Sequence, residues 1–162
     1  MKMNFLYLSR NNYYRLCILL CAFAIFLGGI IYILFRPSEV IFFYWFRTVG
    51  LDNWFNLARH KSLSLYQYLP EWIVFSFPNG LWAFAYALLI TVIWSGSKSL
   101  SSYFWMVSIP VLVLGFEILQ YAKVIPGTFC IQDITLGLAG LITGIQVGIK
   151  INKFKNHEKA TE

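Results

Sequence analysis

Two carboxylates lie inside long apolar stretches of the sequence: Glu117 in VLVLGFEILQYA and Asp133 in CIQDITLGLAGLITGIQVGI. Only 7 of the 162 residues are acidic, and an acidic side chain at membrane depth is costly and usually faces a bundle interior or a polar cavity. Such a pair could serve a proton relay, general acid catalysis, glycoside hydrolysis or metal binding. The alternative is structural: both carboxylates only cap or anchor helices at the membrane interface.

A short link predicts how these groups meet. Residues 123–130 join two apolar stretches and contain Pro126-Gly127, which is a strong turn signal. We therefore expect an antiparallel helical hairpin. It would bring four polar side chains to a similar depth near one membrane surface: Glu117, Gln120, Gln132 and Asp133.

The two carboxylates have different electrostatic positions in this hairpin. Asp133 would lie in the first turn of a helix, where negative charge is favoured, whereas Glu117 would lie near a helix C-terminus. Glu117 must therefore be protonated, solvated in a cavity or paired with a cation. Arg36 and Lys123 are the nearest cations by topology, and Asn79 could add a hydrogen-bonding group. If the long loop folds back, it could also bring Arg47, Arg59 or His60 within reach. There is no histidine at ligand spacing and no nucleophile-elbow or P-loop pattern. The sequence thus predicts no metal and no cofactor, and it leaves enzymatic activity open.

The composition indicates an integral membrane protein, because 59% of the residues are hydrophobic and only 12% are charged. We expect one all-α domain over residues 1–162 with four transmembrane helices, each close to the roughly 20 residues that cross a bilayer. The predicted spans are Tyr14–Phe35, Trp72–Trp94, Tyr103–Ala122 and Ile131–Ile149.

Lysine and arginine predict the orientation of these spans. More of them flank the spans on the side of the two termini than on the other side, which places both termini in the cytoplasm. Residues 150–162 would form a basic cytoplasmic tail. Because the net charge of +6 follows from this flanking pattern, we expect a lipid bilayer as partner and no nucleic acid. The residues on the side of the termini are Lys2, Arg10, Arg15, Lys98, Lys150, Lys153, Lys155 and Lys159.

Two further segments suggest packing surfaces. The loop between the first two spans is aromatic, with IFFYWF at 41–46 and Trp54-Phe55. We expect it to form one or two short interfacial or re-entrant helices over the outer mouth of the bundle, with a plain lipid anchor as the alternative. The last span carries a glycine stripe, which favours tight helix packing, preferably within the chain, although a homo-oligomer stays open. The stripe consists of Gly137, Gly140, Gly144 and Gly148.

The stretch FEILQYAKVIPGTFCIQDITLGLAGLITG resembles the signature of the VanZ-like membrane proteins, the family named for a teicoplanin-resistance factor. In that pattern a Glu and a Gln end one transmembrane helix, an Asp opens the next, and glycines follow seven and eleven residues later. The resemblance covers about residues 70–148 and implies a bacterial plasma-membrane protein with a role in glycopeptide resistance or envelope integrity. The matching residues are Glu117, Gln120, Asp133, Gly140 and Gly144.

The chain also departs from the VanZ-like pattern. The link reads PGTF without the usual Arg, Gly137 replaces the usual Asn, and Asn79 and Ala83 stand where the earlier helix typically has Asp and His. We therefore expect a divergent member, either with Arg36 or Lys123 as substitute charge partner or without the ancestral activity.

Three hypotheses for function follow. The first is an extracytoplasmic-facing polar site for an envelope or lipid-linked molecule. The second is a non-catalytic helix-packing or partner subunit that uses the glycine stripe and the aromatic loop. The third is a proton-coupled transporter. The polar site of the first hypothesis would consist of Glu117, Gln120, Asp133, Asn79 and Arg36.

Overall fold

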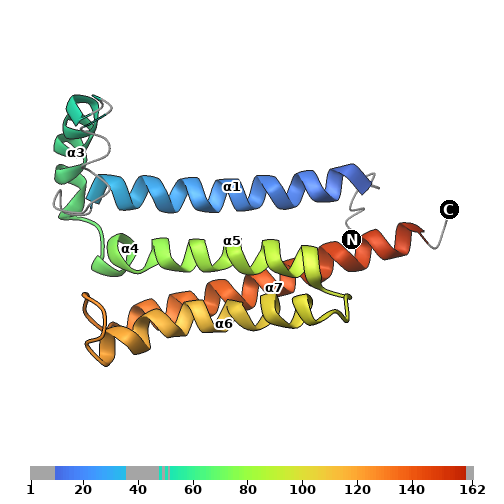
Figure 1. The fold of residues 1–162 in the computed structure, drawn as a ribbon. Coiled ribbons are helices and arrows are strands. Elements are labelled where there is room, and N and C mark those ends of the chain that lie inside the picture. The colour runs from blue at the N-terminus through green and yellow to red at the C-terminus, as the bar shows by residue number, and fades with distance from the viewer. Residues whose placement is uncertain (1–9, 36–47, 49, 51, 160–162) are drawn as a thin grey trace.

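The computed structural model describes residues 10–35, 48, 50 and 52–159, and within that part of the chain every regular element is a helix (Figure 1). The predicted all-α class is confirmed, and four of the described helices, α1, α5, α6 and α7, are long and apolar enough to cross a membrane. The aromatic run at 41–46 lies outside the described residues. The helices are α1 (Arg10–Phe35), α3 (Asp52–Tyr66), α4 (Glu71–Phe75), α5 (Phe77–Trp94), α6 (Leu100–Tyr121) and α7 (Ile131–Lys159).

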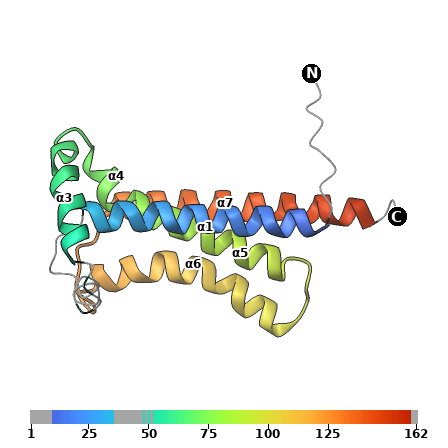
Figure 2. The same ribbon diagram turned by 90° about the horizontal axis from the view of Figure 1, so that it is seen from above.

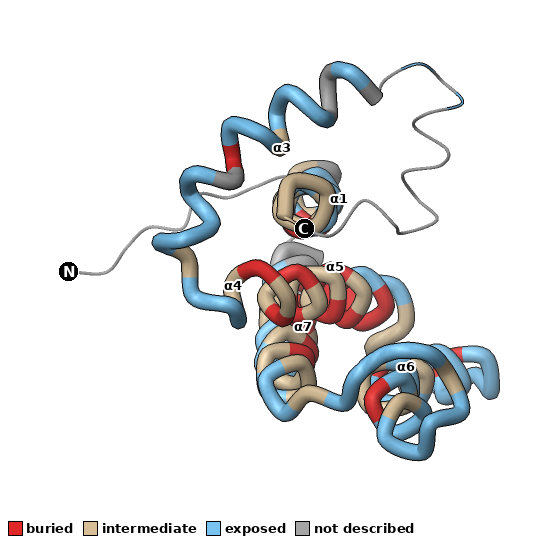
Figure 3. The backbone as a smooth tube through the Cα atoms, turned by 90° about the vertical axis from the view of Figure 1, so that its left-hand side faces the viewer, coloured by how far each residue is buried: buried red, intermediate tan, exposed pale blue. Residues whose placement is uncertain are grey.

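Helix α5 lies at the centre of the bundle, between α1 and α7, and α6 lies to one side (Figures 1 and 3). The small residues of α5 explain its central position, because glycine and alanine let neighbouring helices approach closely. Leu88 of α5 is fully buried, and it packs in one cluster with Cys17 and Cys21 of α1 and with Ile151 of α7. Most of α6, by contrast, is exposed along its length (Figure 3).

Helices α5 and α7 run parallel and touch backbone to backbone. A methyl group added at Gly144 would lie 2.5 Å from the carbonyl oxygen of Phe84 and 2.9 Å from Cβ of Ala87. One added at Gly140 would overlap the carbonyl oxygen of Gly80. The glycine stripe therefore packs inside the chain: Gly140, Gly144 and Gly148 face α5, and Gly137 faces α6.

One end of the bundle, where residues 122–130 join α6 to α7, is called the link end below (Figure 2). Here the predicted second span is divided at Ser76 into α4 and α5. Pro78 explains the break, because proline has no N–H to donate to the carbonyl of Val74 yet fits the first turn of a helix. Helix α3 lies across this end of α1 (Figure 1), and Ser62 Oγ donates a hydrogen bond to the Leu34 carbonyl at 3.3 Å.

At the opposite end, α7 continues ten residues beyond the predicted boundary, to Lys159. No glycine or proline follows Gly148 in this helix, so nothing in the sequence stops it. Asn152 Nδ2 donates to Ser95 Oγ at 2.7 Å and also reaches the carbonyl oxygens of Thr91 and Val92, at 3.2 and 3.3 Å. These carbonyls belong to the last turn of α5, so Asn152 caps α5 from a neighbouring helix.

Candidate functional site

Glu117 joins α6 to the start of α7. Its side chain is only 6% exposed, and Oε2 accepts a hydrogen bond from the backbone N–H of Cys130 at 3.2 Å. Cys130 directly precedes α7, and its N–H belongs to the group of donors that a helix start leaves free. Among the described residues, the hydrogen-bond partner of Glu117 is therefore a backbone donor.

Lys123 is not the partner of Glu117, because its side chain is exposed and the two form no ion pair among the described residues. It has instead a backbone role at the end of α6. Its φ is 57°, its N–H donates to the Gln120 carbonyl at 3.0 Å, and the N–H of Val124 donates to the Leu119 carbonyl at 2.9 Å. This pair of bonds closes a Schellman turn, in which glycine is the usual residue at the left-handed position.

Asp133 lies in the first turn of α7, as the sequence predicts, where the helix dipole favours its charge. Its N–H donates to the Cys130 carbonyl at 3.1 Å, and the N–H of the same Cys130 donates to Glu117, so the hairpin brings both acidic residues to the start of α7. Asp133 Oδ1 is enclosed by protein and has no hydrogen-bond partner in the described part of the chain.

Gln120 lies beside the link. A Cβ added at Gly127, whose φ is 139°, would overlap the amide nitrogen of Gln120, so the side chain packs directly on this turn. Gln120 Oε1 is also enclosed and finds no hydrogen-bond partner among the described residues. The positive φ and the close approach together explain why glycine follows Pro126.

Ser76 is the member of this region that the sequence analysis missed. It is 0% exposed, and its hydroxyl likewise lacks a partner in the described structure. The Gly80 N–H donates to the Ser76 carbonyl at 3.2 Å, so Ser76 lies one helical turn before Gly80. Gly80 packs against Leu136 of α7. Because α5 and α7 are parallel, Ser76 is therefore level with the first turn of α7. Only the register of α5 against α7 reveals this placement.

Neither Asn79 nor Gln132 forms a hydrogen bond with these groups in the described part of the chain. The Asn79 side chain, in the first turn of α5, is partly exposed and makes no hydrogen bond within the described structure. Gln132 is exposed. Arg36 lies outside the described residues. The site at the link end is therefore defined below as Glu117, Gln120, Asp133 and Ser76, and is called the acceptor site.

Acceptor oxygens predominate in the acceptor site. The carboxylate oxygens and the amide oxygen of Gln120 accept hydrogen bonds, and the donors that the site itself contains are the amide nitrogen of Gln120 and the hydroxyl of Ser76. The described residues contain no group of three or more histidine, cysteine, aspartate or glutamate side chains that could hold a metal ion. The arrangement is suited to a ligand that supplies hydrogen-bond donors.

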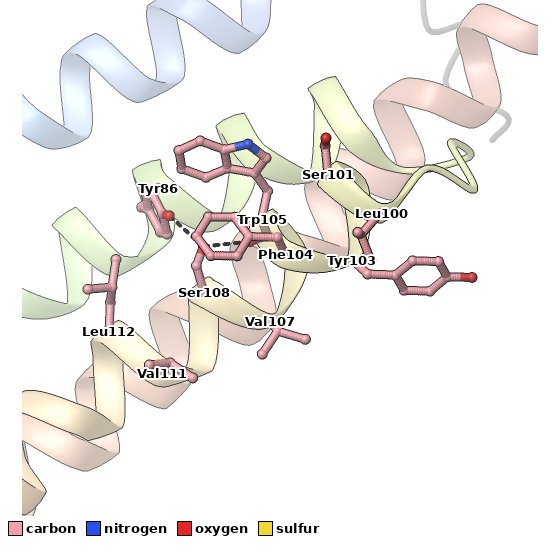
Figure 4. A pocket seen from close by; sticks show the side chains of 10 residues that line it. All are labelled: Tyr86, Leu100, Ser101, Tyr103, Phe104, Trp105, Val107, Ser108, Val111 and Leu112. Atoms are coloured by element: carbon pink, nitrogen blue, oxygen red, sulfur yellow. Dashed lines mark hydrogen bonds between the residues drawn. The ribbon is translucent and has the colours of Figure 1, made fainter.

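A separate groove of about 970 Å³ lies along α6. Its lining comes almost entirely from outward-facing side chains of α6, and α5 contributes Tyr86 (Figure 4). Tyr86 and Ser108 share a hydrogen bond of 2.7 Å between their hydroxyl oxygens. The groove is otherwise mainly apolar and includes no member of the acceptor site.

Comparison of the chain with family models, with curated proteins and with solved structures finds no match.

Proposed function

We propose that the chain is a multi-pass membrane protein of the VanZ-like kind, and that its acceptor site binds a polar or lipid-linked molecule of a bacterial cell envelope. The observation that carries the proposal is the pair of enclosed, unpartnered oxygens, Asp133 Oδ1 and Gln120 Oε1, beside the buried Glu117. A role in glycopeptide resistance or envelope integrity would follow from such binding.

Membrane insertion is supported by what the helices expose. The outward faces of α1 and α6 are covered with large apolar side chains, among them Phe23 and Phe26 on α1 and Phe104 and Phe116 on α6. A soluble monomer rarely exposes so continuous an apolar surface. Four helices of sufficient length give this surface the dimensions of a bilayer core.

The proposed orientation puts the acceptor site on the extracytoplasmic side. Both ends of the described chain lie away from the link end (Figure 1). The charged side chains described near those ends are cations, and Arg15, Lys98, Lys150 and Lys153 are all exposed. An excess of lysine and arginine favours the cytoplasmic side, so the link end would face outward.

Binding is the function that best accounts for the unpartnered oxygens. Leaving a buried acceptor without a donor costs about 1–3 kcal/mol, and more for a charged group. A protein that only needed a closed hairpin could replace these polar side chains with apolar ones of similar shape at little cost. A bound molecule that donates hydrogen bonds would remove the penalty and give the polar residues a purpose.

The competing hypothesis of a helix-packing subunit loses its main surface. It relied on the glycine stripe and the aromatic loop as docking faces. Three of the four glycines are covered by α5 of the same chain, and the aromatic run at 41–46 lies outside the described residues. We therefore place the working part of the molecule at the link end.

The test is mass spectrometry of lipids and envelope precursors that co-purify with the full chain from bacterial membranes. Wild type is compared with the double variant Glu117→Gln/Asp133→Asn, which keeps side-chain size and removes both charges. Glu71→Gln is the matched control, because Glu71 is an exposed carboxylate on α4 at the same end. A molecule enriched on wild type and on the control, and lost from the double variant, supports the proposal. Identical bulk lipid on all three refutes it.

A further inference from the structure

The acceptor site contains more acceptor capacity than the described protein fills. A carboxylate can accept about four hydrogen bonds, yet the described structure gives Glu117 only the bond from the Cys130 N–H. Asp133 Oδ1 and Gln120 Oε1 accept none there. No lysine or arginine forms an ion pair with Glu117 among the described residues. The unfilled acceptors favour a ligand that donates hydrogen bonds, and the two carboxyl groups favour one that carries a positive charge.

Ser76 makes the same point independently of the carboxylates. Its hydroxyl is on a different helix, on a residue that is 0% exposed, and it lacks a hydrogen-bond partner in the described chain. Its helical row faces α7, because a Cβ on Gly80 would lie 2.9 Å from the Leu136 carbonyl oxygen. Ser76 lies one turn nearer the link end than Gly80, so it is level with the first turn of α7, the turn that contains Asp133.

We infer that the acceptor site recognises a primary ammonium group. This inference rests on the proposed function and adds the chemical class of its ligand. A primary ammonium carries a positive charge to match the carboxylates and three N–H donors that can satisfy separate acceptors. A quaternary ammonium has the same charge but no N–H, so it would leave Asp133 Oδ1 and Gln120 Oε1 without donors.

The depth of the site suits an ammonium group at a membrane surface. Glu117 lies four residues before the end of α6 at Tyr121, which is about 6 Å of helix. Tyr121 and Phe129 form an exposed aromatic pair with ring centroids 5.3 Å apart, and such residues are enriched where the bilayer meets water. The ammonium of a lipid headgroup and that of a small free amine could both reach this depth.

The experiment is native mass spectrometry of the full-length chain with equimolar phosphatidylethanolamine and phosphatidylcholine of identical acyl chains. We expect wild type to retain the ethanolamine lipid over the choline lipid by about tenfold, the ratio that corresponds to about 1.4 kcal/mol. Asp133→Asn should lose most of this preference, and Glu71→Gln should keep it.

A second arm of the experiment adds free ethanolamine or free choline to wild type. Displacement by free ethanolamine alone indicates that the ammonium group is recognised whatever molecule carries it, and failure of both to displace indicates that the lipid is required.

Ser76→Ala keeps the inference testable if Asp133→Asn fails to fold. Removing an unsatisfied buried hydroxyl should leave stability unchanged or raise it, so a purely structural serine predicts an unaltered lipid preference. A preference that falls in Ser76→Ala supports the inference, and one that does not change contradicts it.

Equal retention of the two lipids by wild type overturns the ammonium inference. It leaves the proposed function to be judged by the molecules that co-purify from bacterial membranes.

Discussion

Replacing Gly144 by alanine should separate the two most tightly packed helices. The added methyl would stand 2.5 Å from the Phe84 carbonyl oxygen and 3.0 Å from the Leu88 nitrogen. Both neighbours are backbone atoms, so no side chain can rotate away, and α5 and α7 must open by about 1 Å to reach ordinary contact. Overpacking of this kind costs about 1–3 kcal/mol, while alanine regains about 1 kcal/mol of helix propensity. Because the clash involves backbone, the overpacking cost should lie at the upper end of this range, about 3 kcal/mol, and the net destabilisation should be about 2 kcal/mol.

The measurement is equilibrium unfolding in mixed micelles titrated with dodecyl sulfate, followed by circular dichroism. Gly115→Ala is the matched control, since Gly115 is also helical but a Cβ there meets nothing within 4 Å. The control should be neutral or stabilised by up to about 1 kcal/mol. If Gly144→Ala proved as stable as Gly115→Ala, the backbone contact between α5 and α7 would not be as close as described.

Three smaller changes test other parts of the fold by the same unfolding assay. Asn152→Ala removes the donor to Ser95 Oγ and should destabilise the protein by about 1–2 kcal/mol; an unchanged midpoint would refute the capping role. Lys123→Gly should stabilise it by up to about 1 kcal/mol, because φ is 57°, and a loss of stability would contradict this. Tyr86→Phe removes the bond to Ser108 and should cost about 1 kcal/mol, with no effect on lipid preference at the acceptor site.

Hydrophobic periodicity and turn chemistry predict most of the helical fold. The first and third spans agree with α1 and α6 to within a few residues, and Pro126-Gly127 correctly predicts the turn between α6 and α7. The division of the second span at Ser76 has a local cause in Pro78, but the apolar residues on both sides make residues 72–94 look like one span. The extension of α7 to Lys159 was missed because a membrane-length criterion ends a span where charges begin.

The acceptor site could be predicted only where one hairpin determines it. Glu117, Gln120 and Asp133 meet because a short link joins their helices, and spacing alone gives that result. Ser76 comes from a helix that is distant in sequence, so its place depends on the register of α5 against α7, which the glycine contacts set. The donor to Glu117 is a backbone N–H. Every residue except proline has this group, so the amino-acid sequence does not show which residue donates.

The contact between α5 and α7 also constrains the order in which the chain can assemble during synthesis. These helices are separated in sequence by α6, so the face of α5 around Gly80 and Ala87 has no partner until α7 emerges from the ribosome. The last described helix therefore closes the centre of the bundle and, through Asn152, also caps a helix made much earlier. A nascent chain stalled within α6 would present an open backbone groove to any other helix with small residues. Quality control of this protein should accordingly act on chains that lack α7.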